Sequence, residues 1–569
     1  DESGVLLGYP GPHAVEHPGR SRPHFKKTPS MSNISDPILE GLQRGWKVLG
    51  GKHGPLPARI DCDVAIIGSG AGAGITAELL TKAGLNVVIV EEGPLKTSTD
   101  FKQREPEAYA SLYQESAGRK TKDKGVTILQ GRSVGGTTTV NWTSSFRTPP
   151  DTLKFWQDKF GLKDYNVEAL APYFQDAQTR LNIAPWAVAP NENNELLRRG
   201  AAKLGIACEV IPRNVKGCYN LGSCGMGCPT NAKQSMLVTT IPFALDHGAT
   251  LLVETRVEQL KIEGGRITGM QCIAVKPNAA PVNAAGPATT IVAKHYVLAG
   301  GAINSPALLL RSKAPDPHKL LGKRTFLHPV AITLAVMKDT VAAWTGAPQS
   351  IYSDHFLHTQ PIDGPIGYKL EVAPLHPVFF GANLPGFGEK QAELFRQYPN
   401  ANVMLALMRD GFHDQAAGGA VELRGDGSPL LDYPLTDYVL EGARRSMLAM
   451  AQIQFEAGAT MVYPGHEMGE GTSTWQATKA AIEALPMKPL LTKIGCAHVM
   501  GGCGLGGDDK LGVTRPDGVH WQLENLSIHD GSIFPTSIGA NPQLSIYGNV
   551  NRLAQGLAKR LSGKDVSLA

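Results

Sequence analysis

Long hydrophobic runs are missing from this sequence. No apolar segment reaches the ~18 residues that a membrane-spanning helix needs. The first thirty residues contain neither the apolar core of a signal peptide nor two adjacent arginines. We therefore expect no integral membrane span and see no signal peptide. The expected location is cytoplasmic, or periplasmic if a partner subunit carries the export signal.

An excess of one charge sign is also missing. Fifty-five Lys and Arg stand against 51 Asp and Glu, a net charge of +4 at pH 7, and the two signs are interleaved along the chain. This pattern predicts no nucleic-acid partner. Cysteine is scarce as well, because eight in 569 residues do not form a disulfide framework. Glycine is abundant, and 64 of them predict many tight turns and close backbone approaches.

The clearest motif lies near the start of the chain. Residues 63–67 (DVAII) are typical of a buried parallel strand, and they end at the glycine turn 68–74 (GSGAGAG). A helical pattern, ITAELLTKAGL, follows, and a second apolar run, NVVIV, leads to Glu91. Strand, glycine turn, helix, strand and acid in this order predict a dinucleotide-binding fold. The plainer alternative is a glycine-rich surface loop.

Each residue type in this motif has a physical task. Gly68 permits the tight turn, and Gly70 lets the backbone approach a pyrophosphate at the positive end of the helix. Ala73 is the third small residue, placed where the helix packs on the strand. Glu91 is placed to bond a ribose hydroxyl. The motif alone does not separate FAD from NAD.

Three further segments resemble the glucose–methanol–choline (GMC) oxidoreductase family. Residues 131–141 (GRSVGGTTTVN) resemble its first signature. Residues 300–312 (GGAINSPALLLRS) resemble its second, with Lys313 where the family usually has glycine. The stretch 525–553 is the third match. The resemblance runs from about residue 61 to the end, with gaps in the middle, and all four motifs follow the family's order.

The resemblance implies an FAD-dependent enzyme and assigns cofactor contacts residue by residue. Gly68, Gly70 and Glu91 would hold the AMP half of FAD. The other implied contacts are Gly135, Gly136 and Asn141 along the flavin and its ribityl chain, Val257 at the adenine, and Asp530 and Gly531 near the pyrophosphate and ribityl.

Alcohol oxidation by hydride transfer needs a base for the hydroxyl proton, and histidine suits this task because its pKa is near neutral. Among sixteen histidines, His498 lies in IGCAHVMGGCG, which is similar to the family's catalytic A-H-x-M-G context. The resemblance places its partner at Asn541, which the following proline restricts to extended conformations. Asn541 can bond the substrate oxygen but cannot act as a base, so His498 is the predicted base. The structural alternatives are a buried, backbone-bonded histidine and a helix N-cap at Asn541. His529 is expected to pack or to lie near the cofactor.

Cys218, Cys224 and Cys228 lie within eleven residues, in a glycine-rich loop followed by proline. Such a loop is compatible with iron–sulfur ligation. Some GMC dehydrogenases carry a three-cysteine [3Fe–4S] cluster in a comparable place, at a different spacing. Other relatives, similar to long-chain alcohol oxidases, have such loops with no cluster implied. A relay cluster, a disulfide or free thiols, and a zinc site without an evident fourth ligand all stay open.

The expected fold class is α/β (α+β overall), with a Rossmann-like FAD-binding domain and a second, mainly antiparallel-sheet substrate domain. The cofactor domain should comprise 58–160, 215–330 and 500–562, and the substrate domain 161–214 and 331–499, after an irregular N-terminal arm, 1–57. VAITLAVM, GYKLEVAPL and NVMLALMRD predict strands of a sheet above the flavin, and DYVLEGARRSMLAMAQIQFEAGA predicts an amphipathic helix. Trp344, Tyr352, Phe379 and Phe380 are candidates for the pocket wall, and plain core positions are the alternative.

The leading hypothesis for function is an FAD-dependent alcohol dehydrogenase that passes electrons to an external acceptor such as a cytochrome or quinone. An oxygen-using alcohol oxidase of the same family is the close alternative. A lyase or photodecarboxylase on the same fold, and a non-catalytic FAD electron-transfer subunit, are further alternatives that would not use His498 and Asn541 in this way. No charged pair marks a site for choline or a sugar acid, and an apolar roof favours a fatty, aromatic or cyclic alcohol.

Overall fold

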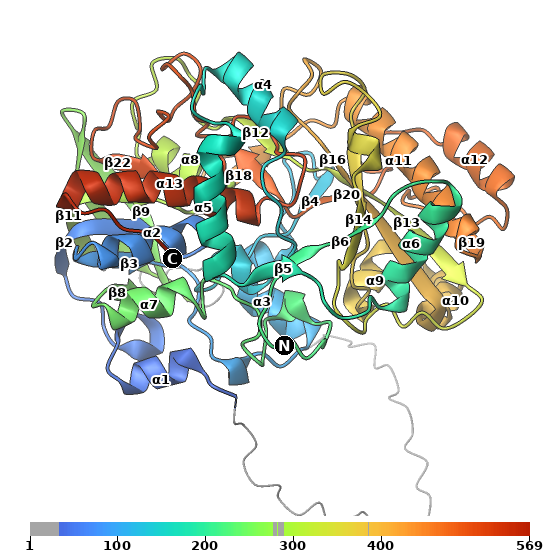
Figure 1. Ribbon diagram of the computed structural model, residues 1–569, viewed down its shortest axis with the longest axis horizontal. Helices are drawn as coiled ribbons and strands as arrows, with labels where there is room; N and C mark the ends of the chain where they lie inside the picture. The colour runs from blue at the N-terminus through green and yellow to red at the C-terminus, as the bar shows by residue number, and fades with distance from the viewer. Residues whose placement is uncertain (1–33, 277–281, 283–288, 385, 569) are drawn as a thin grey trace, which may run out of the picture. The chain divides into compact units, whose positions relative to one another are not determined.

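Two large sheets organise the part of the chain that the computed structural model describes, residues 34–276, 282, 289–384 and 386–568 (Figure 1). At the centre of the first sheet, β2 (Arg59–Ile67) lies between β3 (Val87–Val90) and β11 (Thr289–Leu298), and all three are parallel. The glycine turn follows β2 and leads directly into α2 (Ala71–Lys82). The strand, turn and helix predicted for this segment are therefore present.

The edges of the first sheet are formed by segments that are remote in sequence. Beyond β3 come two more parallel strands, β8 (Thr250–Leu252) and β1 (Lys47–Leu49). On the other side, the N-terminal part of β11 pairs antiparallel with β10 (Arg266–Ala274), which pairs with β9 (Thr255–Glu263). The C-terminal part of β11 pairs with β22 (Leu526–Ile528). The carboxyl ends of the six parallel strands, β1, β8, β3, β2, β11 and β22, thus lie at one edge, where α/β folds place their ligands.

Helix α2 is buried on nearly all sides, which explains its apolar, small-residue sequence. It packs against α13 (Gln543–Ser562) and α7 (Thr240–Asp246), and α13 packs in turn against α5 (Val167–Arg180). Gly72, in the first turn of α2, lies against the backbone after β22, where an added Cβ would be 1.6 Å from the carbonyl oxygen of His529. Only glycine permits this approach of helix to strand.

The second sheet is mainly antiparallel, as the sequence predicts. Its centre is β13 (Val330–Met337) paired with β16 (Ala401–Met408), and every residue of β16 is buried. Helix α11 (Asp437–Glu456) packs across both strands. The sheet also contains β4 (Val126–Ile128), β6 (Glu209–Val210), β14 (Ile351–Ser353), β15 (Tyr368–Glu371), β19 (Ala459–Pro464) and β20 (Ile494–Cys496).

The remaining strands form two smaller sheets. A four-stranded sheet has the order β18 (Pro429–Asp432), β17 (Gly419–Leu423), β12 (Lys323–Leu327) and β21 (Val499–Gly501), and a separate pair is β5 (Ile183–Pro185) and β7 (Pro212–Asn214). The other helices are α1 (Pro37–Gln43), α3 (Glu105–Leu112), α4 (Pro150–Phe160), α6 (Glu192–Lys203), α8 (Gly301–Arg311), α9 (Pro377–Asn383), α10 (Gly388–Arg396) and α12 (Trp475–Ala484).

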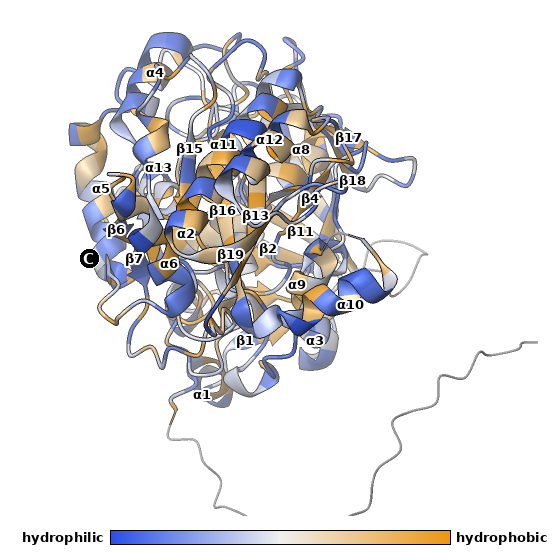
Figure 2. Cartoon of the chain, turned by 90° about the vertical axis from the view of Figure 1, so that its right-hand side faces the viewer, coloured by the Kyte–Doolittle hydropathy of each residue, from blue (hydrophilic) through white to orange (hydrophobic). Residues whose placement is uncertain are grey.

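Apolar side chains gather into two cores, one around each large sheet. In Figure 2 the outer helix α10 is mostly blue, whereas the interior strands carry the orange of hydrophobic residues. Within the described ranges, no helix combines the length and apolar character needed to cross a membrane. The fold class predicted from the sequence is confirmed: a parallel α/β sheet with helices, and a second, mainly antiparallel sheet.

The structure differs from the predicted domain organisation in two details. Residues 1–33 of the predicted arm lie outside the described residues, but the rest of the arm is not irregular, because it holds α1 and β1. Strand β1 forms through pairing with β8, a partner that local composition cannot show. The segment 161–214 is divided, since α5 packs on α13 and α6 packs on α11. Asp36–Ala569 forms one compact unit, so the domain boundaries stay a prediction.

Gly72→Ala should lower the melting temperature, because its new methyl group would meet the backbone of His529 at 1.6 Å. Overpacking of this kind costs about 1–3 kcal/mol. The matched control is Gly556→Ala, in exposed α13 surface with no atom within 4 Å of the added Cβ. Thermal melting of both variants beside the wild type checks this, and equal melting temperatures would contradict the close packing.

Candidate active site

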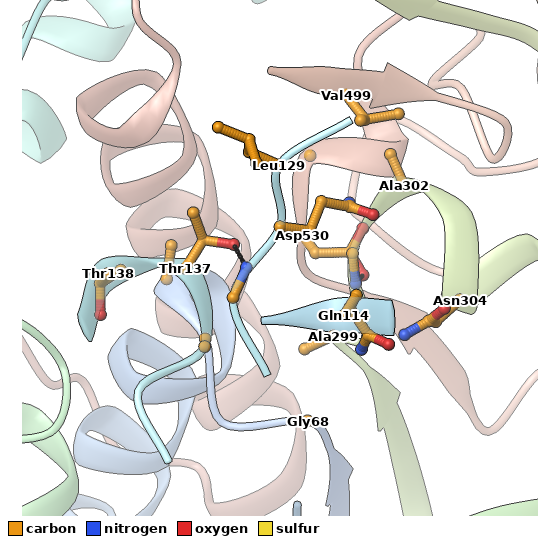
Figure 3. A pocket seen from close by; sticks show the side chains of 18 of the residues that line it. Gly68, Gln114, Leu129, Thr137, Thr138, Ala299, Ala302, Asn304, Val499 and Asp530 are labelled. Atoms are coloured by element: carbon orange, nitrogen blue, oxygen red, sulfur yellow. Dashed lines mark hydrogen bonds between the residues drawn. The ribbon is translucent and has the colours of Figure 1, made fainter. Parts of the chain in front are cut away.

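A cavity of about 800 Å³ joins the two sheets. At one end it is lined by the carboxyl-terminal residues of β2, β3 and β11, which are Ile67, Val90 and Leu298. Its wall also includes Val330 of β13 and Leu407 of β16, from the second sheet. Figure 3 shows Gln114, Thr137 and Asp530 around this space. These residues come from separate parts of the chain.

Most sequence-predicted site residues meet in this one cavity. Two of them, Ala73 and Gly135, stand outside the lining: Ala73 is fully buried within α2, and Gly135 forms a left-handed turn with φ +89°. The other ten of the twelve predicted catalytic and cofactor-binding residues line it: Gly68, Gly70, Glu91, Gly136, Asn141, Val257, His498, Asp530, Gly531 and Asn541.

Two glycine loops approach each other at the floor of the cavity. Gly68 has φ +101°, and an added Cβ would lie 2.4 Å from the carbonyl oxygen of Ala299. Gly136 has φ +54°, and its added Cβ would lie 2.8 Å from the Cα of Gly70. In front of Gly70 there is room, because the nearest atom to its added Cβ is at 3.9 Å. This open space lies at the N-terminus of α2, whose free N–H groups attract anions.

Glu91 fixes the glycine turn to the end of β3. One carboxylate oxygen accepts from the amide and the hydroxyl of Ser69 at 3.1 and 2.5 Å, and the other accepts from the amide of Gly93 at 2.7 Å. Burial raises the pKa of Glu91 to about 7. Each carboxylate oxygen has two lone pairs, and the oxygen bonded to Gly93 accepts only this one bond, so Glu91 retains acceptor capacity.

Asp530 connects the end of β22 to a second helix N-terminus. Its carboxylate accepts from the amide of Gly301 at 2.8 Å and the hydroxyl of Ser305 at 2.5 Å, both in the first turns of α8. It also accepts from the amide of Ser532 at 2.8 Å. Burial raises the pKa of Asp530. The side chain is therefore a helix cap as well as part of the cavity wall, and the carboxylate compensates the positive end of α8.

Asn141 is held by a residue that the sequence analysis did not single out, Gln543. The Asn141 amide donates to the side-chain oxygen of Gln543 at 2.6 Å. The Gln543 amide donates to Ser145 at 2.8 Å and to Asn214 at 3.1 Å. Gln543 lines the cavity at the first position of α13, two residues after Asn541. Gln543 directly follows the predicted Asn541-Pro542 pair, and this position was the sequence signal that could have identified it.

His498 lies where the chain crosses from the second sheet to the four-stranded sheet, between β20 and β21. The thiol of Cys496 accepts from the amide of His498 at 3.2 Å and donates to its carbonyl at 3.2 Å. Nδ1 of the ring is 3.2 Å from Nδ1 of His328. Burial, and secondarily the charge of Lys369, lower the pKa of His498 to about 3. The ring is therefore neutral near neutral pH.

Asn541 does not cap a helix, because the N-cap position of α13 is Pro542. Its amide nitrogen donates to Oε2 of Glu371 at 3.1 Å, and Glu371 pairs with Lys369 at 3.4 Å. Both charged side chains are on β15 and are almost fully buried. The amide oxygen of Asn541 is buried with no hydrogen-bond partner in the described part of the chain. A buried acceptor without a partner indicates a place for a ligand donor.

The cavity lining includes apolar residues, but not the aromatic residues that the sequence suggested. Trp344, Tyr352, Phe379 and Phe380 are absent from the described lining of the cavity, and Trp344 instead stacks on Tyr398. The prediction was wrong because an aromatic side chain in a strand or loop packs equally well in a core. Apolar residues of the cavity lining include Trp142, Val330, Leu405, Leu407 and Val499.

The cysteine loop lies next to the segment that carries Asn141. The ammonium of Lys233, which is buried, donates to the carbonyls of Thr139, Asn141 and Cys224 at 2.7–2.8 Å. Cys218, Cys224 and Cys228 are free thiols, so the disulfide that the sequence left open is not formed among them. Across the described ranges, no group of three or more His, Cys, Asp or Glu residues is arranged to hold a metal ion. The iron–sulfur and zinc hypotheses gain no support from this arrangement.

Comparison with known proteins agrees with the motifs. Two family models described as GMC oxidoreductase match residues 109–330 and 415–549. A GMC-type oxidoreductase of Mycobacterium tuberculosis is 29% identical over 511 residues, which cover 89% of this chain and 77% of that protein. A long-chain-alcohol oxidase of Arabidopsis thaliana is 26% identical over 530 residues, covering 88% and 68%.

Solved structures show the same fold at lower identity. Pyridoxine 4-oxidase from Mesorbium loti superposes with a TM-score of 0.64 at 18% identity, covering 87% of this chain and 99% of that one. A formate oxidase gives a TM-score of 0.62 at 14% identity, covering 89% and 99%.

Gly70→Val should yield folded protein that does not retain a dinucleotide. Gly70 has φ −73°, and the nearest atom to its added Cβ is the Cα of Gly136 at 3.9 Å, so the backbone tolerates a Cβ at this position. The methyl groups of valine would occupy the space where a pyrophosphate approaches the turn. The measurement is flavin absorbance per protein after purification, with Gly556→Val as the control at an exposed position with open surroundings. Full flavin content in Gly70→Val would refute this placement.

Proposed function

The chain belongs to the GMC oxidoreductase family, and from this premise we propose that it binds FAD and oxidises a neutral, apolar alcohol to an aldehyde or ketone. One observation carries the proposal. A single cavity joins the glycine turn of a dinucleotide-binding fold to His498 and Asn541 beneath an apolar wall. A non-catalytic electron-transfer subunit would have no use for that pair.

The residues present fit FAD. The open space before Gly70 and the N-terminus of α2 suit the pyrophosphate, and Glu91 offers acceptors for a ribose. We place the adenine at Val257 and the ribityl and flavin along Gly136, Asn141 and the Asp530-Gly531 segment, all in the cavity lining. When bound, FAD supplies the acceptor for the hydride that leaves the carbinol carbon.

His498 and Asn541 would bind the substrate hydroxyl. The unpartnered amide oxygen of Asn541 can accept a hydrogen bond from it, and Glu371 holds the amide in that orientation. Oxidation of an alcohol removes a proton from oxygen together with the hydride from carbon. We propose that this step depends on His498, the base predicted from the sequence, because it lies in the same cavity wall as Asn541.

The substrate class follows from the wall around this pair. Trp142, Leu405 and Leu407 offer apolar surface, so a hydrocarbon chain or ring is favoured over a charged sugar acid. The relatives named long-chain-alcohol oxidases support the same class. Transfer of each buried CH₂ group from water contributes ~0.8 kcal/mol, so affinity should rise with chain length until the cavity is full.

Two electron acceptors are candidates, an external redox partner such as a cytochrome or quinone, and molecular oxygen. The argument for a partner rested on a relay cluster at Cys218, Cys224 and Cys228, which form no metal-binding group in the described structure. The relatives that are named long-chain-alcohol oxidases favour oxygen. Reoxidation of the alcohol-reduced enzyme in air, within seconds, would support oxygen; persistence of the reduced flavin would support a partner.

The proposed reaction is tested by anaerobic mixing of the flavin-loaded enzyme with a series of straight-chain and cyclic alcohols. Loss of flavin absorbance is the expected result, and His498→Ala should slow this reduction by about 10²–10⁴-fold while leaving FAD bound. The control is His318→Ala, a half-exposed histidine paired with Asp509 outside the cavity lining. A wild-type rate of flavin reduction in His498→Ala would contradict the proposed function of this site.

The rate of flavin reduction should show no inflection from His498 between about pH 5 and pH 8, where an ordinary histidine would titrate near ~6.5. The reason is the pKa of about 3, which burial imposes on this ring. A group with a lowered pKa stays neutral until the pH falls through that low value. A pH series of limiting reduction rates checks this; a loss of rate as the pH falls through ~6.5, abolished in His498→Ala, would show an ordinary pKa.

A further inference from the structure

Two buried cations, Lys233 and Arg213, lie outside the cavity lining, against the segment that carries Asn141. Their exposed fractions are 2% and 1%. The ammonium of Lys233 donates to the carbonyl oxygens of Thr139 and Asn141 at 2.8 Å and to that of Cys224 at 2.7 Å. An ammonium has three N–H donors, so each is used on a neutral carbonyl. The hydrogen bonds of Lys233 therefore fix its position without cancelling its charge.

The backbone around both cations follows the cavity wall. Met236, three residues after Lys233, donates its amide to the hydroxyl of Thr138 at 3.0 Å, and Thr138 lines the cavity. Arg213 is in β7, and its backbone pairs with that of Ser144, another lining residue. Both cations thus belong to segments that pack directly on the wall along which we place the flavin.

Neither cation is paired with a carboxylate among the described residues, and no Asp or Glu contributes to the pKa shift of either side chain. The guanidinium of Arg213 donates to the backbone carbonyls of Pro348 and Gln349 and is 3.7 Å from the thiol of Cys224. Burial lowers the pKa of Lys233 to about 8, which is still above neutrality. A buried charge is costly unless an opposite charge compensates it. The arrangement therefore indicates an anion on the cavity side of this wall.

The proposed reaction supplies such an anion. An alcohol loses one proton and one hydride when it becomes an aldehyde or ketone. In the proposed function the proton goes to His498, and the hydride goes to the flavin. The hydride brings two electrons and one negative charge to a ring that is uncharged when oxidised. A fixed cation close to that ring stabilises the new charge, and it needs no rearrangement at the moment of reaction.

We propose that Lys233 is a positioning residue whose buried charge makes the bound flavin easier to reduce, and that Arg213 adds to the same positive field. This inference rests on the proposed binding of FAD and leaves His498 as the base. Two unit charges ~10 Å apart, at an effective dielectric constant of ~20, interact strongly enough to change an equilibrium constant about tenfold. Nζ of Lys233 is 2.8 Å from the carbonyl oxygen of Asn141, a lining residue, so its charge acts on the cavity at short range.

The thiols of the cysteine loop compete for this charge. Cys218, Cys224 and Cys228 are the acidic side chains that influence Lys233. Although burial opposes the shift, hydrogen bonds from Thr230 and from the backbone of Lys233 lower the pKa of Cys228. A thiolate at Cys228 would cancel the ammonium, and replacing Lys233 would then leave the flavin unaffected. The two possibilities predict different reduction potentials for the flavin.

Two substitutions at position 233 separate charge from hydrogen bonding, because Lys233→Gln keeps N–H donors without the charge and Lys233→Arg keeps both. The equilibrium constant for reduction of the bound flavin is measured at pH 7 against a reference dye. It should fall at least about tenfold in Lys233→Gln, which is ~30 mV for a two-electron couple. Lys233→Arg should stay within about threefold of the wild type, since its guanidinium is always charged. The matched control is Lys493→Gln, whose lysine also donates to two backbone carbonyls but lies outside the cavity lining.

The outcomes distinguish this inference from the proposed function. Equal potentials in the wild type and Lys233→Gln would overturn the role of Lys233 and leave FAD binding intact. Equally lowered potentials in Lys233→Gln and Lys233→Arg would also overturn it, because they would report lost packing rather than lost charge. A wild-type protein that holds no flavin would overturn both the inference and the proposed function. The expected control result is a wild-type potential in Lys493→Gln.

A measurement on the wild-type holoenzyme covers the case in which Lys233→Gln does not fold. Nitrogen NMR of lysine-labelled protein detects buried, hydrogen-bonded ammonium groups, and Lys233→Arg identifies the signal of Lys233. Reduction of the flavin with dithionite should move this signal more than that of Lys493, because a negative charge appears close to Lys233 alone of the two. A Lys233 signal that does not move on reduction would overturn the inference.

Discussion

The close approach of Gly70 and Gly136 is the constraint on which the rest of the site depends. These glycines belong to segments more than sixty residues apart, and a Cβ on Gly136 would lie 2.8 Å from the Cα of Gly70. Their contact brings the second loop, with Asn141, to the mouth of the first sheet. Asn141 then engages Gln543, which begins α13, and α13 covers α2. The cofactor cradle and the helix that supports it are therefore fixed by the same contact.

The substrate end depends on buried polar groups rather than on shape alone. Lys369 and Glu371 form an ion pair inside the second sheet, where burial lowers the pKa of the lysine to about 8. Buried charges are tolerated only when paired and hydrogen-bonded, and here the carboxylate is also bonded to Asn541. On the opposite side, Gly539 and His328 hold the ring of His498. His498 and Asn541 are thus each held by their own buried partners, which limits the orientations available to the substrate oxygen.

Local patterns in the sequence predicted those helices and strands whose periodicity is visible within a few residues. The run from Asp63 through the glycine turn gave β2 and α2, and VAITLAVM gave β13, because strand and helix periodicities are visible within a few residues. The expectation of an irregular arm failed at β1, whose strand conformation depends on pairing with β8. The suggestion that aromatic residues line the cavity was wrong as well, because apolar character does not distinguish a core position from a cavity wall.

The sequence by itself determined the family, the fold class and the two ends of the cavity, since Gly68, Gly70, Glu91, His498 and Asn541 lie in motifs with a recognisable order. Only the tertiary structure decided what surrounds these residues. His328 and Glu371 come from loops and strands far from His498 and Asn541 in the chain, and no local pattern marks them. Their influence depends on distance, burial and hydrogen-bond direction. A sequence carries the identity of each donor and acceptor, but which one faces which is settled when the two sheets pack together.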